Sequence, residues 1–255
     1  MVTGIKKCSP WGAFLALLGA FLCLACRSSR EATVPEPVVV TRAAPGGSPF
    51  DLVWLDELGL WVGATEVTWD EYLAFCAWDR PLDSEIDGAT RPSKPLDVHP
   101  YDRTWGAGSR PAVGMSRRAA QAYCEWLSDV TGERYRLPTE AEWEAFAGSP
   151  KPRQASAWFE RDRTEPVATK QPNDLGLYDV YGNLWEYCSD GWSAHEPERP
   201  VLRGGSWRDR LRQVSLDSRL AFEDDWTLDD PGVPPGWWWI PSGEHLGFRI
   251  VREGD

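Results

Sequence analysis

The sequence predicts a single irregular, loop-rich α+β domain that follows an export segment. Its 255 residues include 16 Trp, 23 Gly and 21 Pro. Rigid aromatic side chains and turn positions are therefore abundant, which argues against a disordered chain and against a long helical bundle. Helical spacing of apolar residues is confined to three capped segments and fades from Ser149 onward. No repeat of about 20 to 50 residues recurs, which excludes a solenoid or a propeller.

The N-terminal segment indicates export. Lys6 and Lys7 precede an uncharged stretch at 11–25, which is shorter than the roughly 20 apolar residues that span a bilayer. The stretch ends in Leu-Cys-Leu-Ala-Cys, which resembles a bacterial lipobox in which Cys23 replaces the usual leucine. This pattern predicts a lipoprotein-type signal peptide over residues 1–25 and lipidation of Cys26. The alternatives are an ordinary cleaved signal peptide and an uncleaved anchor.

Residues 26–49 are predicted to form a flexible tether, because Ser, Pro, Gly and Ala are frequent there and apolar periodicity is weak. The domain itself is predicted over residues 50–253. We therefore expect an exported, membrane-anchored lipoprotein that faces the periplasm or the cell exterior. The formal net charge of −12 argues against nucleic acid as a partner and against polybasic attraction to anionic lipid, so acyl chains would supply the anchor.

The first predicted helix begins at Thr68, which can form a capping box with Glu71. The residues at helical spacing on its expected buried face are Trp69, Tyr72, Leu73 and Cys76. Beyond Cys26, the chain holds three cysteines, Cys76, Cys124 and Cys188. Because three is odd, at least one of them must stay unpaired within the chain.

Two further helices are predicted from caps of the same kind. Ser116 caps the second helix and Gly132 ends it. Its expected inward residues are Ala119, Ala120, Tyr123, Leu127 and Val130. Thr139 and Glu142 form a second capping box, before a short third helix whose apolar side holds Trp143 and Phe146.

Five short motifs, taken together in this order, point to a known family. They are TEVT (65–68), RLPTEAEWE (136–144), GLYDVYGNLWE (176–186), LRGGSW (202–207) and LGFR (246–249). In order and spacing they resemble the sulfatase-modifying-factor domain, the fold of formylglycine-generating enzyme, over about residues 50–253. The resemblance implies an irregular α+β fold related to C-type lectins. It also implies an activity, because active members oxidise a sulfatase cysteine to formylglycine with copper and oxygen.

The chain departs from this family at the positions that carry its chemistry. Asp209 and Val214 stand where the resemblance places the two copper-binding cysteines, and a carboxylate with an isopropyl group cannot hold Cu(I). Ile250 stands where the resemblance places the disulfide partner of Cys124, and His245 replaces an asparagine. We therefore expect a variant that lacks the catalytic cysteine pair, with no catalytic residue and no copper.

The resemblance implies one calcium site, in the motif at 176–186. Its ligands would be the side chains of Asp179 and Glu186 and the carbonyls of Gly182 and Leu184. Hard oxygen ligands from a tight loop suit Ca²⁺. The alternative is that Asp179 and Glu186 only cap turns or pair with arginine.

Other residues in the motifs have structural roles on physical grounds. Gly182 and the pair Gly204 and Gly205 suit a positive φ or a close approach of two backbones. Arg203 and Arg249, each beside glycine in an apolar context, are expected to be buried partners of acids such as Glu142 or Glu186.

Three functions remain open at this point. The favoured one is a binding or scaffold module for a peptide, protein or glycan, with a groove near Trp185, Ser206, Asp209 and His245. The second is an enzyme, either a sulfatase-modifying oxidoreductase or another metal-dependent oxidase with its metal on Asp209 and His245. The third is a structural envelope component that docks a partner through the Trp-rich segment at 223–242, whose tryptophans could instead fold onto the core.

Overall fold

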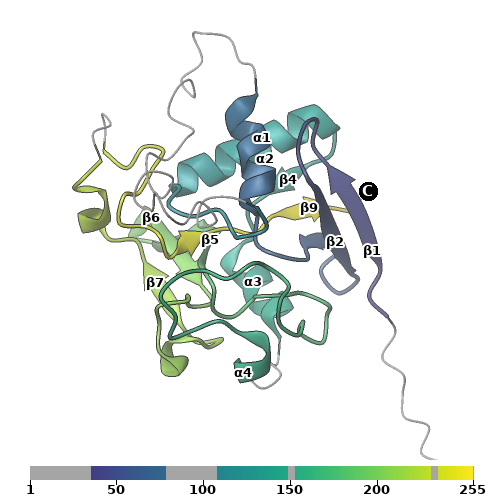
Figure 1. Cartoon of the computed structure of the whole chain (residues 1–255). Coiled ribbons are helices and arrows are strands. Elements are labelled where there is room, and N and C mark those ends of the chain that lie inside the picture. Colours follow the sequence, from purple (N-terminus) through teal and green to yellow (C-terminus); the bar gives the residue numbers. More distant parts are fainter. Residues whose placement is uncertain (1–35, 79–107, 149–152, 231–234, 255) are drawn as a thin grey trace, which may run out of the picture. The chain divides into compact units, whose positions relative to one another are not determined.

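Two β-sheets organise the described part of the chain, which comprises residues 36–78, 108–148, 153–230 and 235–254 of a computed structural model. Both sheets belong to a unit that spans Pro37–Asp255. Two helices, α1 (Trp69–Ala77) and α2 (Arg117–Thr131), lie side by side in this unit (Figure 1). The predicted signal peptide and the predicted lipidation site, Cys26, lie outside the described residues.

The first sheet has five strands in the order β1-β2-β3-β9-β4, and all its neighbours are antiparallel. Its strands are β1 (Val39–Ala43), β2 (Pro49–Leu55), β3 (Leu60–Gly63), β4 (Tyr135–Arg136) and β9 (Val251–Glu253). Along β2, Phe50 and Leu52 are buried while Asp51 between them is exposed. This alternation turns one face of the strand toward α1 and α2.

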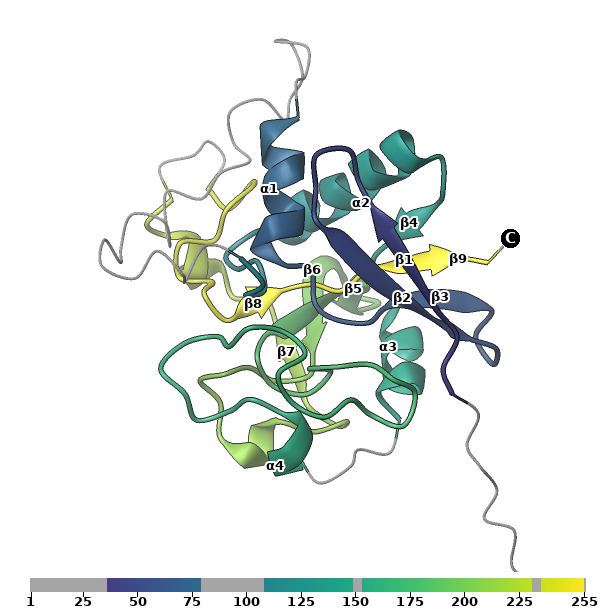
Figure 2. The same cartoon turned by 45° about the vertical axis from the view of Figure 1, so that its right-hand side comes forward.

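The second sheet has four strands in the order β7-β6-β5-β8. They are β5 (Trp185–Ser193), β6 (Glu196–Arg203), β7 (Arg219–Ala221) and β8 (Leu246–Gly247). β5 pairs antiparallel with β6 and parallel with β8. The first four residues of β5 are buried, and the far end of the β5–β6 hairpin is exposed (Figure 2).

The three predicted helices are confirmed, with their caps. Capping boxes occur at Thr68 and at Thr139, where α3 (Glu140–Ala147) begins. Ser116 accepts a hydrogen bond from the backbone of Ala119 at the start of α2, and Gly132 ends α2 with a left-handed φ of +74°. The remaining helical pieces are α4 (Arg153–Ser156) and two 3₁₀ turns, Leu211–Gln213 and Asp224–Thr227.

The buried face of α1 differs from the predicted one. Trp69 and Tyr72 are buried as expected, but Phe75 occupies the third core position, and Leu73 and Cys76 are only half-buried. Phe75 packs at 5.8 Å against the ring of Tyr123 on α2. The bulkier aromatic ring therefore takes the place that the spacing had given to the thiol.

The ordered unit begins earlier than the predicted domain boundary at residue 50. Residues 39–43 form β1, which pairs with residues 49–53 in register from Val39 to Ala43. The prediction of a flexible tether is therefore wrong for this stretch. Three successive valines at 38–40 are the β-branched signal that supports a strand there.

Two glycines are required where the motifs meet. Gly182 has a φ of +81°, and a Cβ at this position would lie 2.2 Å from the carbonyl oxygen of Trp158. Gly204 has a φ of +97°, and its Cβ would lie 2.8 Å from the carbonyl oxygen of Val180. Both positions therefore exclude any side chain, as the sequence predicted.

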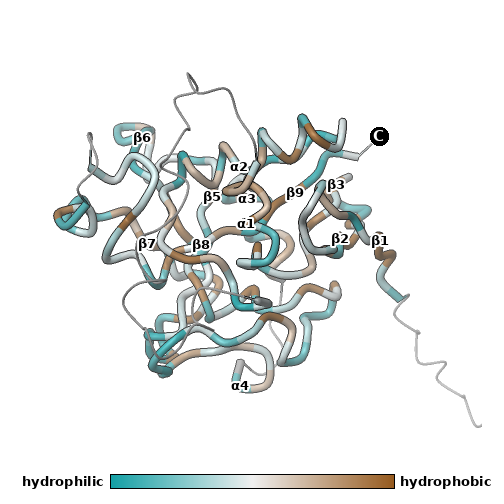
Figure 3. The backbone as a smooth tube through the Cα atoms, turned by 45° about the horizontal axis from the view of Figure 1, so that its top comes forward, coloured by the Kyte–Doolittle hydropathy of each residue, from teal (hydrophilic) through white to brown (hydrophobic). Residues whose placement is uncertain are grey.

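Apolar residues are interspersed with polar ones along the whole coloured trace (Figure 3). Within the described ranges, no helix combines the length and the apolar character needed to cross a bilayer.

Candidate functional site

A buried ion pair lies at the centre of the motif region. The guanidinium of Arg249 donates to Oε1 of Glu186 at 2.8 Å, and both side chains are fully buried. Arg249 also donates to the carbonyl oxygens of Gly63 at 2.8 Å and Tyr178 at 2.7 Å, and the indole of Trp143 donates to Oε2 of Glu186 at 2.9 Å. The predicted pairing of Arg249 with Glu186 is confirmed, and it connects three segments that are distant in sequence.

A second buried carboxylate, Glu66, lies beside this pair. It accepts hydrogen bonds from the backbone N–H of Leu184 at 2.9 Å and from the amide of Asn183 at 2.7 Å. Burial, and then the charges of Asp179 and Glu186, raise its pKa well above the usual value. Glu66 was assigned no role in the sequence analysis. The sequence signal that could have indicated one was an acidic residue placed directly before Val67 and the helix cap at Thr68.

Asp179 completes this cluster of buried acids. Its Oδ2 accepts a hydrogen bond from the backbone N–H of Ala168 at 2.7 Å, and its Oδ1 is buried without a partner in the described part of the chain. Burial raises the pKa of Asp179 to about 6. An unpartnered buried oxygen in an acidic cluster fits a hard cation. Both oxygens of Glu186, however, already accept hydrogen bonds, and no cluster of three His, Cys, Asp or Glu side chains suited to a metal occurs within the described ranges.

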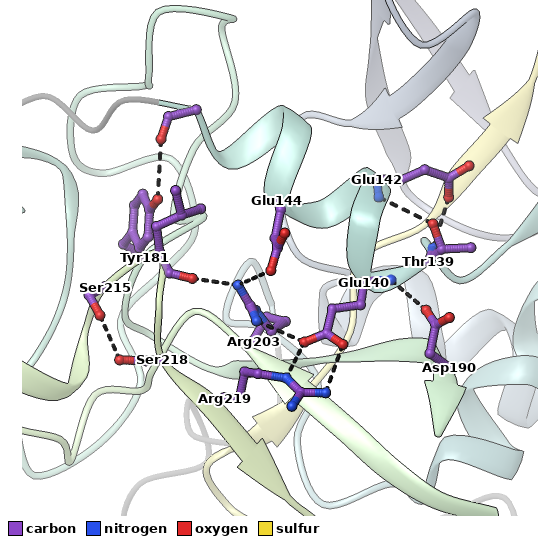
Figure 4. A network of polar contacts seen from close by, with 12 residues as sticks. Thr139, Glu140, Glu142, Glu144, Tyr181, Asp190, Arg203, Ser215, Ser218 and Arg219 are labelled. Atoms are coloured by element: carbon purple, nitrogen blue, oxygen red, sulfur yellow. Dashed lines mark hydrogen bonds and ion pairs between the residues drawn. The ribbon is translucent and has the colours of Figure 1, made fainter. Parts of the chain in front are cut away.

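The other predicted buried arginine, Arg203, joins α3 to the second sheet (Figure 4). Its guanidinium contacts Glu140 at 2.7 Å and Glu144 at 2.8 Å. Glu142 instead caps α3 and pairs with Arg136 at 2.7 Å. The prediction that Arg203 is buried and paired holds, but its acids are the neighbours of Glu142 along the helix.

Asp209, at the first of the two positions expected to hold a catalytic cysteine, is the acceptor of three hydrogen bonds. Its Oδ2 receives the indole N–H of Trp185 at 2.7 Å, the backbone N–H of Ser206 at 2.8 Å and the Ser206 hydroxyl at 2.6 Å. This arrangement fixes the turn that follows β6. It uses the carboxylate as a structural acceptor for neutral donors.

Val214, at the second of these positions, is fully buried in an apolar cluster. A Cβ built on Gly205 would lie 3.0 Å from one of its methyl groups, so the two chain segments are in close contact. A bonded carboxylate and a buried isopropyl group supply none of the thiolates that Cu(I) requires. The residues at these two positions therefore do not fit copper.

His245 is fully buried, and neither of its ring nitrogens has a hydrogen-bond partner among the residues that the structure describes. Burial, and then the charge of Arg208, lower its pKa to about 3. The imidazole meets the ring of Trp226 edge-on at 4.9 Å, and its backbone carbonyl accepts the N–H of Trp185 at 2.9 Å. At neutral pH this residue is an uncharged core side chain.

The four residues predicted to line a groove are thus brought together but not as a groove. Trp185 joins Asp209 through its indole and His245 through its backbone. Trp185, Ser206 and His245 are buried, and only Asp209 is partly exposed. As lining of an open surface, the prediction is wrong for the three buried residues. Trp185 and Ser206 donate hydrogen bonds to Asp209, whereas the ring of His245 packs against Trp226.

Two of the described cysteines, Cys124 and Cys188, do not replace the missing pair. Cys124 and Cys188 are buried thiols outside any disulfide, and burial raises the pKa of both. Ile250, at the expected disulfide position, is buried in the same core cluster as Cys124. Buried cysteines of this kind are chemically inert.

The tryptophans of the segment at 223–242 mostly fold onto the core, as one of the two alternatives held. Trp238 is buried, and Trp226 and Trp239 are half-buried. Trp237 is the exception, because 38% of its surface remains exposed.

The family model of the sulfatase-modifying factor enzyme 1-like domain matches residues 48–253. A protein of Bos taurus named inactive C-alpha-formylglycine-generating enzyme 2 is 35% identical over 163 residues, which cover 49% of this chain and 52% of the relative. The formylglycine-generating enzyme of Streptomyces coelicolor is 32% identical over 195 residues, covering 59% of this chain and 55% of the relative.

A third relative has another name. The serine/threonine-protein kinase pkn1 of Chlamydia pneumoniae is 35% identical over 130 residues, which cover 40% of this chain and 20% of that protein. The chain thus spans between a fifth and about half of the length of these three curated relatives.

Solved structures show the same fold at lower identity. Treponema denticola variable protein 1 superposes with a TM-score of 0.57 and 21% identity, covering 85% of this chain and 99% of that one. The α+β architecture and the matched range agree with the family indicated by the five motifs. The chain therefore belongs to the family of sulfatase-modifying factor enzyme 1-like domains, as a variant without the catalytic cysteine pair.

Proposed function

We propose that this protein is a binding or scaffold module for a peptide, protein or glycan, built on the formylglycine-generating-enzyme fold and without its oxidase activity. The observation that carries this proposal is the environment of positions 209 and 214. We call these the former cysteine positions, because the family resemblance places the two copper-binding cysteines there. Asp209 is held by three hydrogen bonds and Val214 is buried, so neither side chain is available to a metal or to a substrate thiol.

The relatives support separating the fold from the activity. One of them is named as an inactive formylglycine-generating enzyme, and another carries a kinase name. The same domain therefore occurs in proteins that are not named for formylglycine generation. The same fold can serve several functions, so the residues of this chain, and not its fold, determine its activity.

The test is a formylglycine assay on the full chain. Copper-loaded protein is incubated with oxygen and a Cys-x-Pro-x-Arg peptide, and the aldehyde is sought by mass spectrometry against a metal-only control. A formylglycine-generating enzyme with both cysteines is the positive control. We expect no aldehyde above the metal-only level, and turnover above it would overturn the proposal in favour of the oxidoreductase alternative.

We also propose that the protein is held at a membrane by lipid on Cys26. The support is the short apolar segment that ends in Leu-Ala-Cys. Cys26→Ser should release the protein from the membrane fraction. An unmodified N-terminus elsewhere in membrane-extracted wild type, found by mass spectrometry, would contradict the anchor.

Calcium at Asp179, Gly182, Leu184 and Glu186 is retained as a proposal as well. Its support is the buried, unpartnered Oδ1 of Asp179.

A further inference from the structure

A groove of about 970 Å³ is lined by neither Asp209 nor Val214, the residues at the former cysteine positions. Three separate segments line it: the first turn of α2, the far end of the β5–β6 hairpin and the residues after β7. The proposed function rests on residues outside this groove. The groove contains Trp237, the exposed tryptophan of the segment at 223–242.

Trp237 is held rigidly at the groove. The guanidinium of Arg118 lies 3.9 Å from the centre of its ring. The Ser116 hydroxyl donates to the carbonyl of Trp237 at 2.8 Å, and the Ser116 N–H donates to the carbonyl of Trp238 at 2.8 Å. One face of the indole is therefore covered by a cation, while 38% of the side chain remains exposed. A pre-positioned aromatic ring offers contact area at a low entropic cost.

The charges around the groove balance. The lining contains three arginines, Arg117, Arg118 and Arg199, and three acids, Glu196, Glu198 and Asp224. Such a lining complements neither a polyanion nor a polycation, because either ligand would meet like charges. An uncharged ligand meets no such penalty.

Two of these arginines are already bonded within the protein. Arg117 donates to the carbonyls of Asp190 at 2.8 Å and Glu198 at 3.0 Å, and Arg199 donates to the carbonyl of Phe222 at 2.7 Å. They hold the walls of the groove in place.

The groups still open to a ligand are hydrogen-bonding ones. The carboxylates of Glu198 and Asp224 make no hydrogen bond or ion pair with the described part of the chain, and both are exposed, as are Gln121 and His195. Carboxylates accept, an amide both donates and accepts, and an imidazole can do either. Such a set can bind hydroxyl groups around an uncharged ring whose apolar C–H face rests on the indole.

We propose that this groove binds a neutral oligosaccharide, with Trp237 as the stacking platform and Glu198 and Asp224 as hydroxyl acceptors. The proposal rests on the proposed function, because it names the ligand class and the place of a binding module. A proline-rich peptide is the competing occupant. It is less well matched because such peptides dock between several exposed aromatic rings, whereas Phe222, the other ring of the lining, packs edge-on against Trp226 at 5.3 Å.

The experiment is calorimetric titration of the full chain in detergent. The neutral probes are cellotetraose, maltotetraose, mannotetraose and N-acetylchitotetraose; a heparin tetrasaccharide and a proline-rich peptide serve as comparison ligands. We expect at least one neutral probe to bind, with an affinity that changes less than about twofold between roughly 50 and 500 mM salt, because no net charge is neutralised.

The variants connect this binding to the groove. Trp237→Ala should weaken it about tenfold or more, as loss of a central aromatic contact does. Glu198→Gln with Asp224→Asn, which keeps acceptor oxygens, should weaken it less. The matched control is Trp78→Ala, which removes an exposed tryptophan outside the groove and should leave the affinity unchanged. Trp237→Phe, with far-ultraviolet circular dichroism, shows that the fold survives.

Three results would overturn this inference: no neutral probe binds, Trp237→Ala and Trp78→Ala behave alike, or the proline-rich peptide alone binds in a Trp237-dependent way. The formylglycine assay is independent of all three. If the protein produces aldehyde and also binds sugar in a Trp237-dependent way, the proposed lack of oxidase activity is wrong and the proposed sugar site stands. If the protein produces no aldehyde and binds no sugar, the proposed sugar site is wrong, and the proposed binding or scaffold function stands with another ligand.

Discussion

Residues 176–186, a family motif, and residues 203–214, which begin in the motif at 202–207 and continue past it, are neighbours in space but hold different kinds of polar group. Gly182 donates its N–H to the carbonyl of Gly204, and Trp207 donates to the carbonyl of Asn183. The first segment places the carboxylate of Glu186 in full burial against the guanidinium of Arg249. The second places a partly exposed carboxylate, Asp209, against neutral donors.

This difference explains which residues a member of the family can change without losing the fold. A buried charge cannot lose its partner without a large penalty, so the Glu186–Arg249 pair is needed by the fold whatever the protein does. The former cysteine positions lie where a carboxylate and an isopropyl group fit without disturbing that pair. The five family motifs therefore indicate the fold. The oxidase chemistry depends on two positions outside these motifs, 209 and 214 in this chain.

The largest effect should follow from Arg249→Met, which leaves the Glu186 carboxylate buried and uncompensated. We expect a loss of about 3–5 kcal/mol in the free energy of unfolding, measured in urea. The matched control is Arg136→Met, at a partly exposed pair with Glu142, which should lose less than about 1 kcal/mol. Equal losses in the two variants would show that burial does not distinguish the pairs.

His245→Leu should change how stability depends on pH. The folded-state pKa of His245 is lowered to about 3, while the unfolded chain takes up this proton near pH 6.5. Wild type therefore loses stability as pH falls below about 6.5, and the variant lacks this loss, so its relative stability should rise by about 2 kcal/mol between pH 7 and pH 5.

Buried acids with a raised pKa make the folded state more stable as pH falls, which is opposite to the effect of His245. Their contribution is the same in wild type and variant, so it cancels when the two proteins are compared. The pKa of Glu71 is raised to about 7 and that of Asp179 to about 6, and both groups are present in the two proteins. Urea unfolding curves of wild type and variant measured across this pH range decide the matter. Stability profiles that run parallel would contradict the neutral, buried state of His245.

Asp209→Ala should cost about 1.5 kcal/mol, because it removes the acceptor for Trp185 and Ser206 at a partly exposed site. Asp209→Asn keeps one acceptor oxygen and should cost less. Thermal unfolding of the two variants gives the comparison. A larger loss for Asn than for Ala would mean that the carboxylate is not the common acceptor.

Calcium should give the smallest effect. Free calcium at about ten times its Kd would stabilise the folded state by about 1.4 kcal/mol, so chelation should lower the melting temperature by a few degrees. Asp179→Ala should abolish this shift. An unchanged wild-type melting curve in chelator, together with no calcium by elemental analysis, would remove the proposed ion.

The features that the sequence predicted well are local ones or strongly constrained ones. Helix caps at Thr68, Ser116 and Thr139 depend on residues within one turn. A buried arginine must find an acid, which made Arg249 with Glu186 predictable as a type of contact. Glu66 was missed because its amide partner, Asn183, lies 117 residues away.

The surface features were harder to predict for the same reason. The groove is assembled from three distant segments, so no spacing in the sequence marks it. β1 was mistaken for tether because prolines and glycines flank a short run of valines. Trp185, Ser206 and His245 were correctly associated, but their burial depends on contacts between distant segments, the hydrogen bonds to Asp209 and the packing of His245 on Trp226, that the sequence alone does not show.

The position of β9 has a consequence for how the protein folds. This strand comes last in the domain, yet it lies between β3 and β4 in the first sheet, and Arg249, which organises the buried acids, comes directly before it. The sheet cannot close, nor can the acids be compensated, until this end of the domain has left the ribosome. Contacts of such long sequence separation make folding slow, so the native sheet forms only after nearly the whole domain has been synthesised.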